Sequence, residues 1–215
     1  MLAYVTTDAA VSREALDICL GRSLDQSFNR ITVDSDTSTS DTVLLFATGE
    51  QIDDDLNDRN DARLPAFQAA LDSVCLDLAQ QIVRDGEGAT KFVEVTVTGA
   101  ANDDAATAIA KAIGDSPLVK TALAAEDANW GRIVMAVGKA GEKADRDRLS
   151  IAVGGVPITR LGQLVADYDE TPVAAHMKDQ EIDIDIDLGV GRGRGTVWTC
   201  DLTHGYISIN ADYRS

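Results

Sequence analysis

Glu87 is the residue of this sequence whose surroundings best suit chemistry. It lies in residues 84–91, Arg-Asp-Gly-Glu-Gly-Ala-Thr-Lys, between a predicted helix and a predicted strand. Because glycine has no side chain, the glycines on both sides of Glu87 allow a backbone or a ligand to approach closely. A carboxylate there suits an ammonium group or proton transfer. The alternative is a helix C-terminal cap, with Gly86 ending the helix and Glu87 solvated. The spacing leaves both interpretations open.

An acidic repeat near the C-terminus resembles a metal site at first. Three aspartates alternate with isoleucines: Asp183, Asp185 and Asp187. Their spacing fits the start of an EF-hand calcium loop, but Leu188 and Arg194 stand where that loop requires glycine and glutamate. Strict alternation instead predicts a strand with a solvated acidic face. We expect Arg192 and Arg194 to pair with these aspartates across a hairpin.

The glycine-rich segment 189–195 has glycine at every second position. A dinucleotide-binding loop would be followed by a helix, and no helix-forming run follows here. We therefore predict that this segment is the turn of the hairpin.

The histidines and cysteines predict neither a metal centre nor a histidine-dependent nucleophile. His176 and His204 are the only histidines, and no serine lies in a Gly-x-Ser-x-Gly elbow. Cys19, Cys75 and Cys200 are far apart and odd in number, so we expect buried, reduced thiols. No metal and no cofactor is expected.

The periodicity of apolar residues predicts the elements that carry these side chains. Helices are expected over 12–28 with Ser12 as N-cap, 64–84, from 102 to 114, from 116 onward, and from 127 to 138. Strands are expected over 2–7, 31–33, 42–48, 92–98, 149–155, 157–162, 181–190, 195–202 and 205–213. Residues 49–63 are expected to form a solvated loop. The mixture predicts an α+β fold, a layered sandwich of mixed sheets and helices.

The charge excludes several classes of partner. Lys and Arg total 19 and Asp and Glu total 36, so the formal net charge is −17. Nucleic acid and anionic membranes are therefore excluded as partners. No apolar run approaches the roughly 20 residues of a membrane span, and the first residues do not resemble a signal peptide. We expect a globular, cytoplasmic protein.

Five segments spread over the whole sequence resemble one known family. They are MLAYVTTDA at 1–9, TSTSDTV at 37–43, DGEGATK at 85–91, DANWGR at 127–132 and INADYRS at 209–215. The sequence is similar to the β chain of the bifunctional glutamate N-acetyltransferase/ornithine acetyltransferase family. Members cleave themselves and use an N-terminal threonine as nucleophile. The resemblance implies an N-terminal-nucleophile-like fold and acetyl transfer from N-acetylornithine to glutamate, by a ping-pong mechanism through an acetyl-threonine.

The nucleophile threonine implied by the resemblance is expected just before Met1 and is not in this sequence. Such a threonine uses its own α-amine as base and needs no histidine. Either the threonine is chemically altered or separately recorded, for example as an acylated threonine, which we favour, or Met1 is an initiator and the chain alone is inert. The alternative function is a related self-cleaving amidohydrolase or aminopeptidase that passes the acyl group to water.

The resemblance implies Glu87, Asn210 and Ser215 as substrate-binding residues. Glu87 can hold the ammonium group of ornithine, Asn210 offers donors and an acceptor, and Ser215 offers a hydroxyl. The family commonly has threonine where Ser215 stands, so the hydroxyl is kept. It commonly has asparagine where Ser40 stands, so we expect the local turn and the substrate preference to depend on this position.

The resemblance also implies a partner. We expect residues 1–215 to be the β chain, with one core shared with an α chain and a small strand-rich C-terminal part, in an α2β2 heterotetramer. An apolar interface is then exposed on this chain alone. Because the substrates are anionic and this chain is acidic, we expect the α chain to supply the cations of the site. Lys91 and Lys120 are the local lysines that must be excluded.

Overall fold

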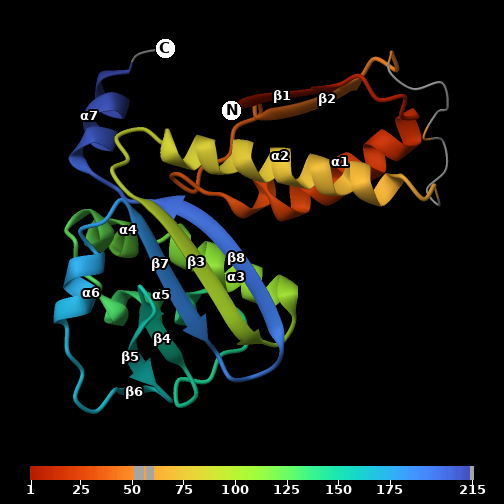
Figure 1. Ribbon diagram of the computed structural model, residues 1–215. Coiled ribbons are helices and arrows are strands. Elements are labelled where there is room, and N and C mark those ends of the chain that lie inside the picture. Colours follow the sequence, from red (N-terminus) through yellow and green to blue (C-terminus); the bar gives the residue numbers. More distant parts are fainter. Residues whose placement is uncertain (51–55, 57–60, 214–215) are drawn as a thin grey trace. The chain divides into compact units, whose positions relative to one another are not determined.

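The structure is a computed structural model that describes residues 1–50, 56 and 61–213 of the chain (Figure 1). The chain divides into two compact units. The first comprises Met1–Asn29 with Asp36–Ile82, and the second comprises Arg30–Ser35 with Val83–Ser215. Most of the loop predicted over 49–63 lies outside the described residues. Among the described segments, every helix is too short or too polar to span a bilayer.

The first unit contains a small parallel sheet and two long helices (Figure 1). Strands β1 (Leu2–Thr7) and β2 (Thr42–Ala47) pair in parallel, from Leu2 opposite Thr42 to Thr7 opposite Ala47. The helices are α1 (Arg13–Gln26) and α2 (Leu64–Arg84), and a short 3-10 helix, η1 (Phe28–Arg30), follows α1. These strands and helices were all predicted from the apolar periodicity, except for the 3-10 turn.

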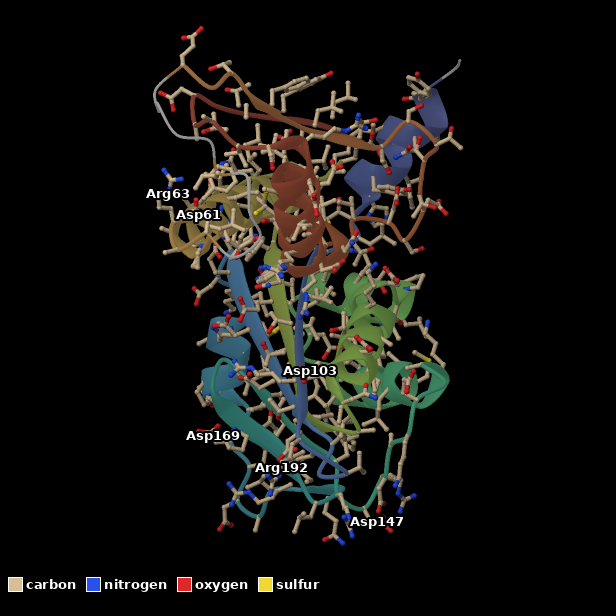
Figure 2. All side chains as sticks on the ribbon, turned by 90° about the vertical axis from the view of Figure 1, so that its right-hand side faces the viewer. Asp61, Arg63, Asp103, Asp147, Asp169 and Arg192 are labelled. Atoms are coloured by element: carbon tan, nitrogen blue, oxygen red, sulfur yellow. The ribbon has the colours of Figure 1, made fainter. Side chains whose placement is uncertain are left out.

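Local polar contacts determine where the two helices begin. The Ser12 hydroxyl accepts a hydrogen bond from the backbone of Ala15, as predicted for an N-cap. Before α2, the carboxylate of Asp61 accepts hydrogen bonds from the backbone N–H of Arg63 at 2.8 Å and from its Nη2 at 2.7 Å. The two side chains lie together in Figure 2. This pairing lowers the pKa of Asp61 to about 2.

The helices α1 and α2 contact each other through buried polar groups. Ser23 is fully buried, and its hydroxyl donates to Asp72 Oδ1 at 2.6 Å. Gln68 Nε2 donates to the Cys19 carbonyl at 3.1 Å. Several apolar residues of α2 are also buried, including Leu71, Cys75 and Ala79. The helix predicted over 64–84 is therefore confirmed, although Val74 on the same stretch is 45% exposed.

The second unit is built on a six-stranded sheet with the order β6-β5-β4-β7-β3-β8. The strands are β3 (Phe92–Ala100), β4 (Ser150–Val153), β5 (Val156–Arg160), β6 (Gln163–Leu164), β7 (Glu181–Asp187) and β8 (Gly193–Cys200). The helices are α3 (Asp103–Gly114), α4 (Pro117–Ala124), α5 (Trp130–Lys139), α6 (Thr171–His176) and α7 (His204–Asp212). Within this six-stranded sheet β3 and β7 pair in parallel and the other neighbouring strands pair antiparallel, so the fold is mixed α+β, as predicted.

The core of the second unit lies between one face of this sheet and helices α3 and α5. Strand β7 shows how the sequence selects that face. Ile182, Ile184 and Ile186 are at most 2% exposed, whereas the aspartates between them are exposed. The predicted strand with one acidic face is therefore confirmed.

The predicted hairpin between β7 and β8 is wrong, because β3 lies between these two strands. β3 pairs in parallel with β7 and antiparallel with β8. The connecting residues pass around the end of β3, where Val190 N and Gly191 N both donate to the Gly99 carbonyl at 2.8 Å. A Cβ on Gly191 would lie 2.2 Å from the Ala100 carbonyl oxygen, so this passage requires glycine.

The expected hairpin through which Arg192 and Arg194 would pair with the aspartates is wrong for the same reason. Arg194 still acts on Asp185: burial and the Asp183 charge raise the pKa of Asp185, and the Arg194 charge opposes that rise. Arg192 lies in the passage around β3, and Asp103 marks the start of α3 (Figure 2). The backbone N–H of Arg194 donates to Asp103 Oδ1 at 2.8 Å, which ties β8 to that helix start.

The predicted strand at 205–213 is also wrong, because these residues form α7. Residues 207–210, Ile-Ser-Ile-Asn, alternate apolar with polar side chains, a pattern that is typical of a strand. None of the residues of α7 is buried, so the alternation does not mark a core face. The Thr203 hydroxyl caps the helix by accepting from Gly205 N at 3.0 Å. Residues 31–33 likewise form no strand; Ile31 makes an isolated bridge to Trp198.

Candidate substrate-binding site

Glu87 and Asn210 are brought together in the second unit, although 123 residues separate them in the sequence. Asn210 Nδ2 donates a 2.6 Å hydrogen bond to Glu87 Oε2. Both residues are exposed, so a ligand can reach them. Ser215, the third predicted binding residue, lies outside the described residues. The arrangement presents a carboxylate and a carboxamide side by side to solvent.

A tight turn displays the carboxylate. Ala89 N donates to the Gly86 carbonyl at 2.9 Å, which places Glu87 and Gly88 at the centre of a four-residue turn. Gly88 has φ +69°, the left-handed conformation that the third residue of a type II turn requires. The left-handed glycine is Gly88 and not Gly86, so the segment differs from the helix cap considered above. Glu87 thus lies at the tip of a tight, hydrogen-bonded turn.

The glycines beside Glu87 allow close backbone packing. A Cβ on Gly88 would lie 2.4 Å from Tyr206 N and 2.6 Å from the carbonyl carbon of Gly205. A Cβ on Gly86 would lie 3.2 Å from Cys200 Sγ. The close approach that the sequence suggested therefore occurs, and the approaching group is the start of α7. This contact brings the helix that carries Asn210 to the turn that carries Glu87.

A buried carboxylate fixes the far side of the turn. Asp201 is 3% exposed and directly follows β8. Its Oδ1 accepts from the backbone N–H groups of Thr90 at 2.8 Å and Lys91 at 3.0 Å, and its Oδ2 accepts from Thr90 Oγ1 at 2.6 Å. A buried carboxylate is tolerated when hydrogen bonds satisfy it in this way.

Helix α7 is held by two further polar contacts. Tyr206 Oη donates to Asp34 Oδ2 at 3.0 Å. Asn210 Nδ2 makes a second hydrogen bond, at 3.1 Å, to the Tyr206 carbonyl one turn earlier. The second contact orients the carboxamide toward Glu87. No sequence pattern indicates that Asp34 and Tyr206 contact each other, and the segment that contains Tyr206 looks like a strand.

Lys91 and Lys120 are both engaged inside the second unit. Lys91 is 7% exposed; its Nζ donates to the Asp179 carbonyl at 3.0 Å and lies 3.6 Å from Glu126 Oε1. Lys120 is 2% exposed, and its Nζ donates to Thr199 Oγ1 at 3.0 Å and to the Cys200 carbonyl. Burial lowers the pKa of Lys120. Neither lysine is presented to a ligand at Glu87.

Arg84, three residues before Glu87, is also engaged. Its guanidinium pairs with the Glu181 carboxylate, with Nη2 3.0 Å from Oε2. It also lies 3.7 Å from the ring centroid of Phe92, a cation–π contact. The positive groups of this chain that lie near Glu87 in the sequence thus have partners of their own.

The histidines and cysteines lie in structural positions. His176 Nε2 accepts from the backbone of Asp183 at 3.1 Å, which joins α6 to β7. His204 is exposed at the first position of α7. All three cysteines are buried and free, as predicted, and burial raises the pKa of the Cys200 thiol. In the part of the chain that the structure describes, no three metal-binding side chains cluster together.

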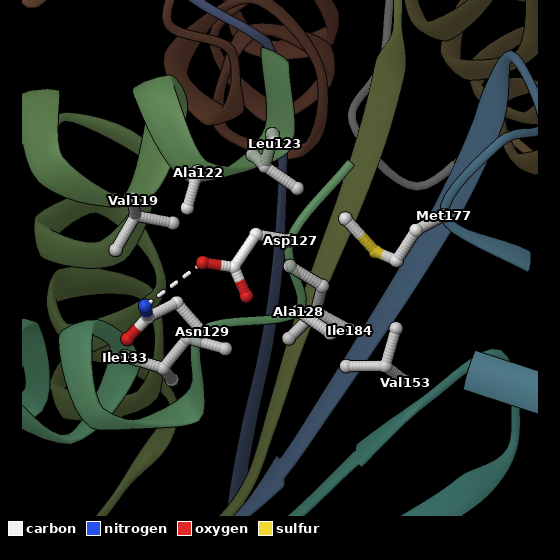
Figure 3. Close-up of a pocket in the computed structure, with 10 residues that line it drawn as sticks. All are labelled: Val119, Ala122, Leu123, Asp127, Ala128, Asn129, Ile133, Val153, Met177 and Ile184. Carbon is white, nitrogen blue, oxygen red and sulfur yellow. Dashed lines mark hydrogen bonds between the residues drawn. The ribbon is translucent and has the colours of Figure 1, made fainter. Parts of the chain in front are cut away.

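The segment 127–132, one of the family-like strings, begins a helix. Asn129 Oδ1 accepts from Arg132 N at 3.2 Å as the N-cap of α5, and Asn129 Nδ2 donates to Asp127 Oδ2 at 3.0 Å. Figure 3 shows this pair beside a small, mostly apolar cavity of about 10 Å³. Such a volume holds about one water molecule and no substrate. This segment therefore has a structural role.

Comparison with known proteins agrees with the fold. The structure and site define a mixed α+β chain that presents an exposed carboxylate–carboxamide pair. The sequence matches the ArgJ family over residues 1–215, and the chain belongs to that family.

Two curated relatives illustrate the match. The chain is 60% identical over 215 residues to the arginine biosynthesis bifunctional protein ArgJ of Zymomonas mobilis, covering 100% of this chain and 53% of the relative. It is 59% identical to the protein of the same name from Gluconobacter oxydans, covering 100% of this chain and 51% of the relative. The chain therefore spans about half the length of the curated relatives it matches.

A solved structure also resembles this chain. It is the crystal structure of the arginine biosynthesis bifunctional protein argJ from Bacillus halodurans, with 42% sequence identity and a TM-score of 0.94. The match covers 99% of this chain and 100% of the solved chain. This similarity confirms the predicted fold class.

Proposed function

We propose that this chain is the β chain of an acetyltransferase of arginine biosynthesis and that Glu87 and Asn210 bind its amino-acid substrates. The whole protein would transfer the acetyl group from N-acetylornithine to glutamate. The observation that carries the proposal is the 2.6 Å contact between the exposed side chains of Glu87 and Asn210, in a member of the ArgJ family.

The reaction proposed for the whole protein has two steps. The hydroxyl of a threonine outside this sequence attacks the acetyl carbonyl, the carbon–nitrogen bond breaks, and ornithine leaves with a proton. The amine of glutamate then attacks the acetyl-threonine ester, the carbon–oxygen bond breaks, and N-acetylglutamate leaves. An N-terminal threonine can move these protons through its own α-amine. Neither step calls for a metal or a cofactor.

The side chains of this chain suit binding in both steps. The carboxylate of Glu87, at the tip of its turn, can pair with the side-chain ammonium of ornithine. Once a ligand replaces the contact to Glu87, the carboxamide of Asn210 can donate through its nitrogen and accept through its oxygen. We propose Ser215 as a third binding residue through its hydroxyl.

An exposed apolar face on the first unit supports a partner chain. Four large side chains on one face of the β1–β2 sheet are between 38% and 65% exposed: Leu2, Tyr4, Leu44 and Phe46. Parallel sheets are normally covered on both faces. The curated relatives are about twice as long as this chain, whereas the solved Bacillus halodurans chain matches it over its full length. These facts support a precursor split into α and β chains, with the α chain covering this face.

The assembly and the source of positive charge belong to the same proposal. We propose an α2β2 heterotetramer in the cytoplasm. Because Lys91, Lys120 and Arg84 are engaged within this chain, the cation that binds the substrate carboxylates would come from the α chain.

The experiment is a product analysis with the whole protein. N-acetylornithine and isotopically labelled glutamate are incubated with the enzyme, and N-acetylglutamate, ornithine and acetate are measured by mass spectrometry. Labelled N-acetylglutamate supports the proposal. Acetate without N-acetylglutamate indicates a hydrolase instead, and the absence of both products indicates a subunit without this activity.

A further inference from the structure

One hydroxyl group joins the two elements of the candidate site. Thr203 Oγ1 donates to the Gly88 carbonyl at 2.7 Å, immediately after Glu87 in the chain. The same oxygen accepts from Gly205 N at 3.0 Å, at the start of the helix that carries Asn210. A hydroxyl can make both contacts because it is a donor and an acceptor at once.

The backbone around this hydroxyl leaves little freedom. The Gly88 turn and the Gly205 backbone touch, since a Cβ on Gly205 would lie 3.1 Å from both Gly88 Cα and Thr203 Oγ1. Thr203 follows Asp201 by two residues, and Asp201 fixes the other end of the turn through Thr90. The segment 201–203 therefore holds the Glu87 turn at two points and then continues directly into α7.

Helix α7 depends on such contacts. None of its residues is buried, so apolar packing within this chain contributes little to its position. The cap at Thr203, the Tyr206–Asp34 contact and the Asn210–Glu87 contact hold it instead. Of these, the Thr203 hydroxyl is the one that bonds both to the Glu87 turn and to the start of the helix.

We propose that Thr203 is a positioning residue, which holds Glu87 and Asn210 at the separation that the substrate requires. This inference rests on the proposed function, because it assumes that the pair binds substrate. Thr203 acts through the Gly88 carbonyl and the first turn of α7.

The test uses steady-state kinetics of the whole protein with N-acetylornithine. Thr203→Val removes the hydroxyl at nearly constant shape, and Thr203→Ala guards against misfolding of the valine variant. Thr203→Ser restores the hydroxyl. Thr107→Val is the matched control, since the Thr107 hydroxyl donates to a backbone carbonyl within α3, away from the site.

We expect Thr203→Val and Thr203→Ala to raise the KM about tenfold, with kcat changed about twofold or less, because a lost hydrogen bond displaces a binding group. Thr203→Ser and Thr107→Val should keep the original KM. A purely structural role predicts a lower melting temperature and less active enzyme with an unchanged KM, and that result overturns the inference.

Glu87→Ala, measured alongside, separates the two proposals. If it raises the KM while the Thr203 variants do not, the positioning role of Thr203 is wrong and the proposed function stands. If Glu87→Ala also leaves the KM unchanged, the proposed binding role fails and the inference fails with it.

Discussion

Gly88 packs directly against the backbone of Tyr206, so closely that a Cβ on Gly88 would lie 2.4 Å from Tyr206 N. This contact requires a residue without a side chain, and its φ of +69° favours glycine as well. The contact explains how two polar residues far apart in the sequence meet at one exposed position. It also makes Gly88 the most informative backbone position to change.

Gly88→Ala should separate Glu87 from Asn210. The added methyl group must displace the start of α7 or the turn, and we expect a loss of stability of about 1–3 kcal/mol together with a raised KM. Thermal unfolding and steady-state kinetics measure the two effects. Gly138→Ala is the control, because it lies in α5 with nothing within 4 Å of its added Cβ. That change should be neutral or slightly stabilising. A normal KM in Gly88→Ala contradicts the prediction.

Asp201→Ala should be strongly destabilising. The change removes the acceptor of the buried Lys91 N–H and of two part-buried Thr90 donors, at a cost of about 2–3 kcal/mol. Thermal unfolding of the whole protein measures it. Asp212→Ala, at the exposed end of α7, is the matched control and should change stability by less than about 0.5 kcal/mol. Equal melting temperatures for the two variants would show that Asp201 does not fix the turn.

Lys120 should make stability depend on pH. Burial lowers its pKa below the ordinary value of 10.5, so between the lowered pKa and 10.5 the unfolded chain binds more protons than the folded chain. The contribution of Lys120 to the free energy of unfolding therefore rises with pH across that window. In Lys120→Met this contribution is absent. Between about pH 7 and pH 10, the melting temperature of the wild type should therefore rise relative to that of the Lys120→Met variant as the pH rises.

The contribution of Cys200 to stability changes with pH in the opposite direction, because burial raises its pKa above 9.0. Its thiol keeps its proton in the folded chain where the unfolded chain loses it, so its contribution to stability falls above about pH 9. A Cys200→Ser variant measured in parallel removes this effect from the comparison.

If the pH dependence of Lys120→Met equals that of the wild type, the lysine is not buried as described.

The apolar face of the β1–β2 sheet should bind the partner chain. Tyr4 is 61% exposed at its centre, and Tyr4→Asp places a charge where we expect apolar contact. Copurification of the two chains and light scattering should show loss of the complex. Tyr4→Phe should bind normally, and so should Lys143→Asp, an exposed charge change in the second unit. A stable complex containing Tyr4→Asp contradicts the assigned interface.

Local patterns were sufficient to predict much of the fold. The cap at Ser12, the helix over 64–84 and the alternation of β7 each depend on near neighbours in the sequence, and each is confirmed. The hairpin was wrong because strand order depends on long-range pairing with β3, which no local pattern reveals. Helix α7 was missed because residues 207–210 alternate apolar and polar side chains although none of them is buried. The alternation therefore did not mark a strand.

The residues of the candidate site likewise divide into those that a local sequence pattern indicates and those that depend on long-range contacts. Glycines beside a carboxylate are a local signal, and they marked Glu87. Asn210 was found through the family resemblance alone, because nothing in its own segment indicates a site. Thr203 and Asp201 gave no signal, since their roles come from hydrogen bonds to residues more than a hundred positions away.

We propose that Glu87 binds the amino-acid substrate, and the KM of the Glu87→Gln variant for N-acetylornithine decides whether it does. Glutamine keeps the size of the side chain and removes the charge, so we expect the KM to rise about tenfold or more. Glu142→Gln, an exposed carboxylate in the loop after α5, should leave the KM unchanged. Equal KM values for Glu87→Gln and the wild-type protein would contradict the claim.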